Sequence, residues 1–245
     1  MVKKLSFYLC GIIACCWFWS AFAYAVGFFM NIFVPKSIDS GHEGPIIQSL
    51  IINSLLISAF GIQHSVMARK KFKQWWTKFI PEPIERSVYV MFASAIFWIS
   101  MLHWQPMTDL VWDVQNTFIK LVFYATFLLG VLMVVHSIFV LDLFDYVGLR
   151  QVHLHFQPGG YVPLEFKTPS IYKFIRHPMT IGALIFFWAT PKMTVGHFLF
   201  AAGMTIYSLI GLKFEERDLI DQFGEEYKTY QQNVGMVLPF QKRNY

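Results

Sequence analysis

The residues best suited to chemistry lie in the last third of the chain, where Arg176-His177-Pro178 precedes an apolar hairpin. The hairpin ends in the acidic pair Glu215-Glu216. Ionisable groups are costly to keep inside a bilayer, so their presence at the mouth of an apolar hairpin indicates a site for a polar ligand. The types of these residues then decide which ligand the site suits.

His177 is predicted to lie at the start of a helix, because proline is favoured at the first helical position. The backbone N–H groups and the dipole at a helix N-terminus favour an anion there. An anionic group of a ligand is therefore expected near His177. The alternative interpretation is an ordinary histidine at the membrane surface.

Glu215 and Glu216 are predicted to face different surroundings, because adjacent residues on a helix point about 100° apart. One carboxylate would then face the bundle and the other would face water. Since a hairpin brings its two ends together, Arg176 or Arg217 is expected to pair with the inward carboxylate. A buried pair of this kind adds little stability, so it suits the amino group or ribose of a charged ligand. The alternative is an ion pair at the surface.

Other ionisable groups lie near the ends of apolar runs. His64 and His136 are each within about two turns of the predicted inner end of a span. Either histidine is a candidate proton acceptor, a haem ligand or an interhelical hydrogen-bonding group. The motif His153-x-His155 lacks a cysteine or acidic partner at a useful spacing, so no metal site is predicted.

The composition is that of an integral membrane protein. Of the 245 residues, 56% are hydrophobic and 14% are charged, whereas soluble domains carry about 25% charged residues. A spanning helix needs roughly 20 mostly apolar residues, and the apolar runs cover residues 7–33, 46–68, 87–104, 118–141, 179–190 and 194–214. We predict an all-α, polytopic membrane helix bundle with about six spans, the last two forming a helical hairpin. Five spans and a re-entrant arm are the alternative.

The chain is predicted to form one domain, residues 1–245, with spans in 1–141 and a cofactor-binding part in 142–245. Residues 142–176 form a loop that is long for such a bundle, and we expect it to be an ordered lid. Residues 214–230 carry apolar side chains at helical spacing. They predict an amphipathic cytoplasmic helix at the C-terminal end, broken or bent at Gly224.

The distribution of positive charge predicts the orientation of the chain. With both termini in the cytoplasm, all but three of the 20 Lys and Arg residues lie on the inner side, the exceptions being Lys36, Lys120 and Lys192. The net charge of +5 is therefore an orientation signal, and no nucleic-acid-binding patch is predicted. The basic run 69–78 is expected to meet anionic lipid head groups. The N-terminal segment resembles a signal peptide, but its apolar run continues to Phe33, so we expect a retained helix.

The ordered set of C-terminal motifs resembles the isoprenylcysteine carboxyl methyltransferase superfamily. The matching residues are Arg176-His177-Pro178, Gly182, Glu215-Glu216, Leu219, Phe223-Gly224, Tyr227, Tyr230, Val234 and Pro239. His64-Ser65, Glu85-Arg86-Ser87 and residues 143–151 are similar to a bacterial branch of that superfamily. The branch contains the methanethiol S-methyltransferases and the NnrU-type proteins that are linked to denitrification.

The resemblance implies a multi-pass enzyme of the bacterial inner membrane that binds S-adenosyl-L-methionine from the cytoplasm. Its expected reaction is the methylation of a small thiol, methanethiol to dimethyl sulfide. The expected cofactor-binding residues are Tyr161, Tyr172, Arg176, His177, Pro178, Gly182, Glu215, Glu216 and Arg217. The family often has a tyrosine two residues after the proline, where this chain has Thr180, so that contact is in question.

A thiol reacts as its thiolate, so a base or a positive field is expected near the acceptor. His64, Asp142 and Arg150 are the candidates for this catalytic role. The expected partners are the thiol substrate and membrane lipids, with no nucleic acid and no evident obligate protein partner. Two alternatives remain open at this point. One is a non-enzymatic NnrU-type accessory protein of nitrogen-oxide or haem metabolism, and the other is a methyltransferase acting on a lipid or prenyl-cysteine.

Overall fold

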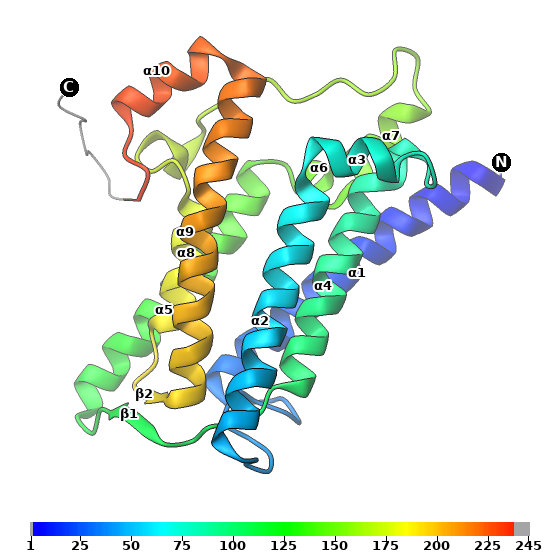
Figure 1. Ribbon diagram of the computed structural model, residues 1–245. Helices are drawn as coiled ribbons and strands as arrows, with labels where there is room; N and C mark the ends of the chain where they lie inside the picture. The colour runs from blue at the N-terminus through cyan, green and yellow to red at the C-terminus, as the bar shows by residue number, and fades with distance from the viewer. Residues whose placement is uncertain (1, 238–245) are drawn as a thin grey trace. The chain divides into compact units, whose positions relative to one another are not determined.

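The chain is mostly helical in a computed structural model that describes residues 2–237 (Figure 1). The helices are α1 (Val2–Met30), α2 (Ile46–Ala68), α3 (Lys70–Trp76), η1 (Glu82–Ile84), α4 (Glu85–His103), α5 (Thr117–Val140), α6 (Leu143–Val147), α7 (Leu149–His155), η2 (Ser170–Lys173), α8 (Pro178–Trp188), α9 (Val195–Phe223) and α10 (Glu225–Asn233). Two short antiparallel strands, β1 (Leu110–Asp113) and β2 (Lys192–Thr194), pair with Leu110 opposite Thr194. The prediction of an all-α architecture is confirmed.

Five helices of the described chain are long and apolar enough to cross a membrane, namely α1, α2, α4 together with η1, α5 and α9. Helix α8 is also apolar but has only 11 residues. At 1.5 Å per residue it rises about 16 Å, roughly half of the hydrocarbon thickness of about 30 Å. The structure is therefore that of a multi-pass membrane protein with five long apolar helices and one short apolar helix.

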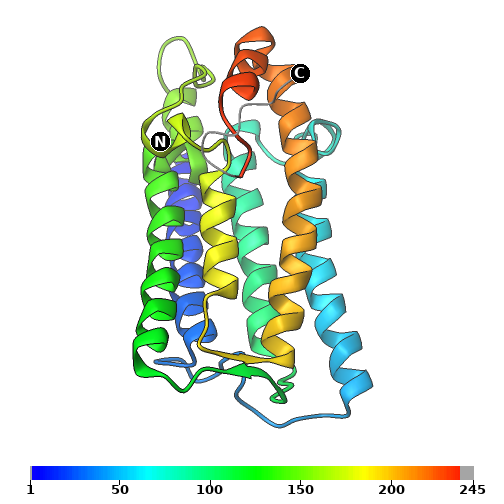
Figure 2. The same ribbon diagram turned by 90° about the vertical axis from the view of Figure 1, so that its left-hand side faces the viewer.

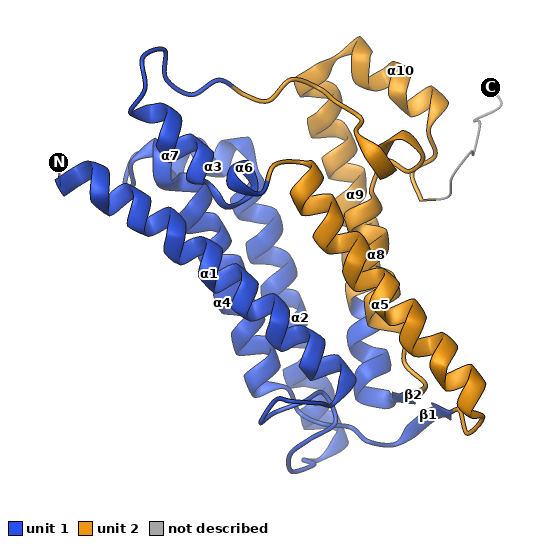
Figure 3. Cartoon of the chain, turned by 180° about the vertical axis from the view of Figure 1, so that it is seen from behind, with its two compact units in different colours: residues 1–113, 143–162, 192–203 blue, residues 114–142, 163–191, 204–245 orange. Residues whose placement is uncertain are grey.

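The chain divides into two compact units (Figure 3). Unit 1 comprises residues 1–113, 143–162 and 192–203, and so contains α1 to α4, α6, α7, both strands and the start of α9. Unit 2 comprises residues 114–142, 163–191 and 204–245, and so contains α5, η2, α8, the rest of α9 and α10. Each unit is built from segments that are distant in the sequence.

In unit 1, α4 packs against both α1 and α2. The buried Asn53 of α2 fixes the chain just after α4, because it accepts a hydrogen bond from Gln105 N at 2.9 Å and donates one to Gln105 O at 2.8 Å. Helices α6 and α7 meet at Gly148, which has a φ of +90°. A Cβ atom there would lie 2.4 Å from Ser87 Oγ, so this turn requires glycine. The first part of the segment predicted to form a lid thus forms α6 and α7.

In unit 2, α5 and α8 run side by side (Figures 1 and 2). Gly130 and Gly182 face each other at their contact, where a Cβ on Gly182 would lie 2.8 Å from Gly130 O. Helix α5 begins at an amide cap, since Asn116 Oδ1 accepts hydrogen bonds from the N–H groups of Phe118 and Ile119 at 2.9 and 3.2 Å. Gly130 and Gly182 therefore set the close spacing of α5 and α8.

Helix α9 runs from the last predicted span into the predicted C-terminal helical segment and ends at Phe223. The predicted break at Gly224 is confirmed, because this residue has a φ of +60° and separates α9 from α10. The polar helix α10 is thereby turned out of the line of α9 (Figure 1). Pro239, the last residue of the C-terminal motif, lies outside the described residues.

Candidate active site

The Arg-His-Pro triplet is fixed at the start of α8 by the chain that follows α10. Pro178 occupies the first turn of α8, and His177 caps it with its carbonyl oxygen, which accepts a hydrogen bond from Ile181 N at 3.1 Å. Arg176 N donates to Gly235 O at 3.0 Å, and Ile175 forms a parallel β-bridge with Gly235. The prediction that His177 lies at a helix start is confirmed.

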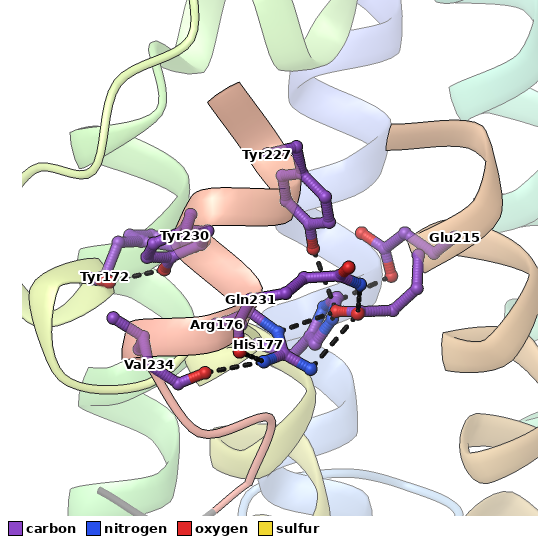
Figure 4. A network of polar contacts seen from close by, with 9 residues as sticks. Tyr172, Arg176, His177, Glu215, Tyr227, Tyr230, Gln231 and Val234 are labelled. Atoms are coloured by element: carbon purple, nitrogen blue, oxygen red, sulfur yellow. Dashed lines mark hydrogen bonds and ion pairs between the residues drawn. The ribbon is translucent and has the colours of Figure 1, made fainter. Parts of the chain in front are cut away.

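The carboxylate of Glu216 lies at the centre of a buried network of hydrogen bonds (Figure 4). Its Oε1 accepts from Arg176 Nε at 3.0 Å, from His177 Nε2 at 2.5 Å and from Tyr227 OH at 2.8 Å. Its Oε2 accepts from Arg176 Nη2 at 3.1 Å and from Gln231 Nε2. Glu216 is 7% exposed, so these donors replace the water that the charge would otherwise need.

Five donors occupy essentially all of the lone-pair capacity of one carboxylate. Glu216 therefore organises the site and has little capacity left for a ligand. Its inward position and its pairing with Arg176 confirm the geometric prediction for the acidic pair. Arg217 does not take part, because it is exposed and its guanidinium lies 5.9 Å from the Phe214 ring.

Arg176 uses its remaining N–H groups to hold the end of α10. Its Nη1 donates to Gln231 O at 3.0 Å and to Val234 O at 2.5 Å. The same guanidinium forms the two-point contact with Glu216, a geometry that lysine cannot reproduce. Arg176 thus joins the beginning of α8 to α9 and to the chain after α10.

Glu215 differs from its neighbour in burial. Its side chain is 54% exposed, and its Oε2 lies 3.6 Å from His177 Nδ1. The imidazole of His177 therefore faces one carboxylate from each of its nitrogens, a buried one and an exposed one (Figure 4). The exposed carboxylate is the group of this pair that a positively charged ligand can reach.

Aromatic rings lie on the α10 side of the network. The ring of Phe166 is 5.2, 5.7 and 5.4 Å from the rings of Phe223, Tyr227 and Tyr230. Tyr230 OH donates to the carbonyl oxygen of Tyr172. Burial raises the pKa of Tyr230 to about 12, and burial together with the hydrogen bond to Glu216 raises the pKa of Tyr227. Both phenols therefore act as neutral donors at physiological pH.

The structure brings together only some of the residues predicted to bind the cofactor. Those in one cluster of unit 2 are Tyr172, Arg176, His177, Pro178, Glu215 and Glu216. Gly182 instead packs against Gly130 of α5, so its lack of a side chain has a packing reason. Tyr161 belongs to unit 1, where its hydroxyl donates to Asp145 Oδ1 at 3.3 Å.

The three predicted catalytic residues lie in different surroundings. Arg150 is paired with Asp145 at 3.1 Å in unit 1, so its charge is already compensated. His64, also in unit 1, packs against Phe60 and Tyr89, with ring centroids 5.5 and 5.4 Å apart. Asp142 lies just after the end of α5 in unit 2, with a φ of +79°.

Sequence reasoning did not assign Tyr227, Gln231 and the carbonyl of Val234 to the site. A signal for the first two exists, because residues four apart share one face of a helix. Tyr227 and Gln231 both reach Glu216 from α10. The Val234 carbonyl carries no side-chain signal. Among residues 2–237, no group of three or more His, Cys, Asp or Glu side chains is placed to hold a metal ion.

Comparison with known proteins shows which family the chain belongs to. The chain is 46% identical over 217 residues to a methanethiol S-methyltransferase of Crocosphaera subtropica. The alignment covers 89% of this chain and 85% of the relative. It is 44% identical over 241 residues to methanethiol S-methyltransferase 1 of Bradyrhizobium diazoefficiens, and this alignment covers 98% of this chain and 85% of the relative. A methanethiol S-methyltransferase of Mycobacterium tuberculosis is 42% identical over 224 residues, which are 91% of this chain and 92% of the relative.

A more distant similarity, 26% identity over 183 residues, links the chain to Nurim of Rattus norvegicus. No protein-family model matches the chain, and no solved structure matches it. The similarity to the Bradyrhizobium enzyme extends over 241 residues, 98% of the chain. This chain therefore belongs to the methanethiol S-methyltransferase family.

Proposed function

We propose that this chain methylates methanethiol with S-adenosylmethionine and so forms dimethyl sulfide. The observation that carries the proposal is the buried Arg176–His177–Glu216 network beside the exposed Glu215, in a chain 42–46% identical to enzymes of that name. The shared name of these relatives supports methanethiol over a lipid acceptor, and it supports an enzyme over an accessory protein.

The chemistry of the donor set fits S-adenosylmethionine. When bound, this cofactor supplies an electrophilic methyl group on a sulfonium and carries a positively charged amino group. The exposed carboxylate of Glu215 suits such an amino group, and the rings of Phe166, Tyr227 and Tyr230 suit a cation or a flat base. We assign the contact with the cofactor to Glu215, Tyr172 and the start of α8.

Arg176, His177 and Glu216 act in this proposal as positioning residues. Methyl transfer needs an in-line approach, so much of the rate comes from holding groups in place before the reaction. Because Glu216 is held by five hydrogen bonds, His177 has a fixed orientation and presents its Nδ1 toward Glu215. The network thereby limits the movement of the carboxylate that meets the ligand.

The acceptor must lose its thiol proton, because the thiolate is the nucleophile. As the new carbon–sulfur bond forms, the bond between the methyl group and the sulfonium breaks, and the thiol proton goes to a base or to water. We propose His64 as that base, because a neutral imidazole can accept a proton, whereas Arg150 cannot and is paired with Asp145. Asp142 is the second candidate. Replacing His64 with alanine without any loss of turnover would remove it from this role.

We propose that the protein lies in the bacterial inner membrane with both termini in the cytoplasm. Lys3, Lys4 and the basic run 69–78 lie at one end of unit 1, and the acidic residues Asp39 and Glu43 lie in the loop that joins the opposite ends of α1 and α2. This distribution agrees with the preference for positive charge on the inner side.

The test is the release of dimethyl sulfide from methanethiol and S-adenosylmethionine by detergent-purified protein, followed by gas chromatography. We expect Glu215→Gln to raise KM for S-adenosylmethionine about 10- to 100-fold, the loss expected for a hydrogen bond to a charged group. Glu226→Gln is the matched control, since Glu226 is exposed on α10. Cofactor binding without any product from methanethiol would move the acceptor to another thiol or a lipid. The absence of both cofactor binding and product would overturn the proposal.

A further inference from the structure

Helix α3 and the turn that follows it form a surface of basic and aromatic side chains. We define this basic-aromatic surface by Lys70, Lys71, Trp75, Lys78 and Phe79, all of which are exposed. The run 69–78 holds five of the 20 Lys and Arg residues of the chain, and no Asp or Glu occurs between Glu43 and Glu82. The surface therefore carries positive charge that its own segment does not neutralise.

The backbone places this surface at the end of a spanning helix. Helix α2 ends at Ala68, and Arg69 takes an extended conformation with φ −73° and ψ +139° before α3 begins at Lys70. Arg69 Nε donates back to Ser65 O at 3.3 Å, which holds the turn against α2. Figure 1 shows α3 at the end of unit 1 where α2 ends and α4 begins. Since α2 has the length of a membrane span, α3 lies at the depth of the lipid head groups.

The aromatic side chains fix α3 to its neighbour and leave apolar surface outward. Trp75 stacks on Trp76 at 5.9 Å and contacts Phe79 at 5.3 Å, while Trp76 packs against Phe92 of α4 at 6.5 Å. Trp75 and Phe79 nevertheless remain 50% and 66% exposed. Exposed Trp and Phe beside lysine side chains are typical of a helix that lies in the membrane interface.

The charges select one kind of lipid. In the described chain, the ammonium groups of Lys70, Lys71 and Lys78 form no ion pair with a carboxylate. Clusters of lysine at the inner end of a span attract anionic lipids by about 1 kcal/mol per residue near the surface. We propose that the basic-aromatic surface binds the head groups of anionic phospholipids, with the ammonium groups on the phosphate and the aromatic rings beside the upper acyl chains.

Native mass spectrometry of the full-length protein in detergent tests this inference. The probes are phosphatidylglycerol and phosphatidylcholine with identical acyl chains. The variant K70Q/K71Q/K78Q removes three charges from the surface, and K3Q/K4Q/K167Q removes three exposed inner-side charges elsewhere. We expect the first variant to lose affinity for phosphatidylglycerol by up to about fivefold per lysine, and the control to lose far less. Equal losses in the two variants, or equal binding of the two lipids, would overturn the proposal.

A second measurement locates the lipid. In vesicles that contain both lipids at the same fraction, phosphatidylglycerol brominated near the head group should quench Trp75 more than brominated phosphatidylcholine does. The difference should shrink in Trp75→Phe, which keeps the other seven of the eight Trp residues, and it should also shrink in K70Q/K71Q/K78Q. Quenching that is the same for both brominated lipids would contradict a site for anionic lipid. Both measurements are independent of methyl transfer, so their outcome does not depend on the proposed enzymatic function.

Discussion

Glu215 and Glu216 are adjacent and chemically identical, yet their surroundings give them different roles. Glu216 is buried and accepts five hydrogen bonds, whereas the side chain of Glu215 is 54% exposed. A buried carboxylate with its capacity filled stabilises the structure around it, and an exposed one can meet a ligand. The acidic pair therefore divides into a positioning residue and a binding residue.

The first prediction concerns stability. Glu216→Gln leaves the guanidinium of Arg176 buried without its carboxylate, and removing one partner of a buried ion pair costs about 3–5 kcal/mol. We expect a large drop in the melting temperature of Glu216→Gln in detergent and little change for Glu215→Gln. Thermal unfolding followed by circular dichroism measures both. If Glu216→Gln unfolds at the wild-type temperature, the central role of this carboxylate is wrong.

The second prediction concerns alkaline pH. An unfolded tyrosine loses its proton near pH ~10, whereas burial raises the pKa of Tyr230 to about 12 in the folded protein. Between these values the folded state binds more protons, so stability falls as pH rises, by about 1.4 kcal/mol per pH unit for this group. The stabilising effect is fully present below pH ~10.

Denaturation midpoints of wild type and Tyr230→Phe at pH values from 9 to about 12 test this assignment. We expect the wild-type curve to fall more steeply, because phenylalanine has no proton to lose. Tyr230→Phe should also be less stable at neutral pH, since it lacks the hydrogen bond to the Tyr172 carbonyl. Parallel curves above pH ~10 would show that Tyr230 titrates at its ordinary pKa in the folded protein.

At the scale of the elements, the contact of α5 with α8 depends on two glycines. A Cβ on Gly182 would lie 2.8 Å from Gly130 O and 2.8 Å from Met133 Cβ, closer than packed atoms approach. The third prediction is that Gly182→Ala destabilises the protein by about 1–3 kcal/mol, because the helices must move apart. Gly211→Ala in α9 is the matched control, since a Cβ there meets nothing within 4 Å.

The control variant is expected to unfold at or slightly above the wild-type temperature, because alanine favours a helix over glycine. Thermal unfolding of both variants decides between a local packing effect and a general intolerance of helical glycines to substitution. The second explanation would hold if both variants lost the same stability. A cofactor contact at Gly182 would instead appear as a raised KM with unchanged unfolding.

The elements show why some features were predictable from the sequence. Helix α2 has the predicted bounds, because its apolar run begins after Pro45 and ends before the charged Arg69. The break at Gly224 was also predictable, since a positive φ there favours glycine. The end of α9 at Phe223 was predictable for the same reason, since Phe214, Leu219, Ile220 and Phe223 keep apolar side chains at helical spacing up to this glycine.

The site itself was only partly predictable. Spacing on a helix separates Glu215 from Glu216 but does not say which one is inward. The partners of Glu216 come from the chain just before α8 and from α10, so tertiary packing decides them. Arg150 was a reasonable candidate for a positive field, yet Asp145 lies close enough to pair with it. Which charge pairs with which is fixed by folding and not by sequence order.

At the scale of the whole molecule, the charge distribution defines two chemically different ends of unit 1. One end carries α3 with its lysines, and the other carries the loop 31–45 with Asp39 and Glu43. The charge difference orients a membrane protein because Lys and Arg side chains are retained on the cytoplasmic side. The fourth prediction is that Lys71 faces the cytoplasm and Ser40 faces the opposite side.

Cysteine labelling tests this orientation in intact cells whose outer membrane has been made permeable. Cys10, Cys15 and Cys16 are first replaced by alanine, and a single cysteine is then introduced as Ser40→Cys or Lys71→Cys. A membrane-impermeant maleimide should label Ser40→Cys in intact cells and Lys71→Cys only after lysis. The inverse pattern would overturn the proposed orientation, because Lys71 would then lie outside the cytoplasm. The expected pattern supports this orientation and leaves the Glu215→Gln kinetics to decide the reaction.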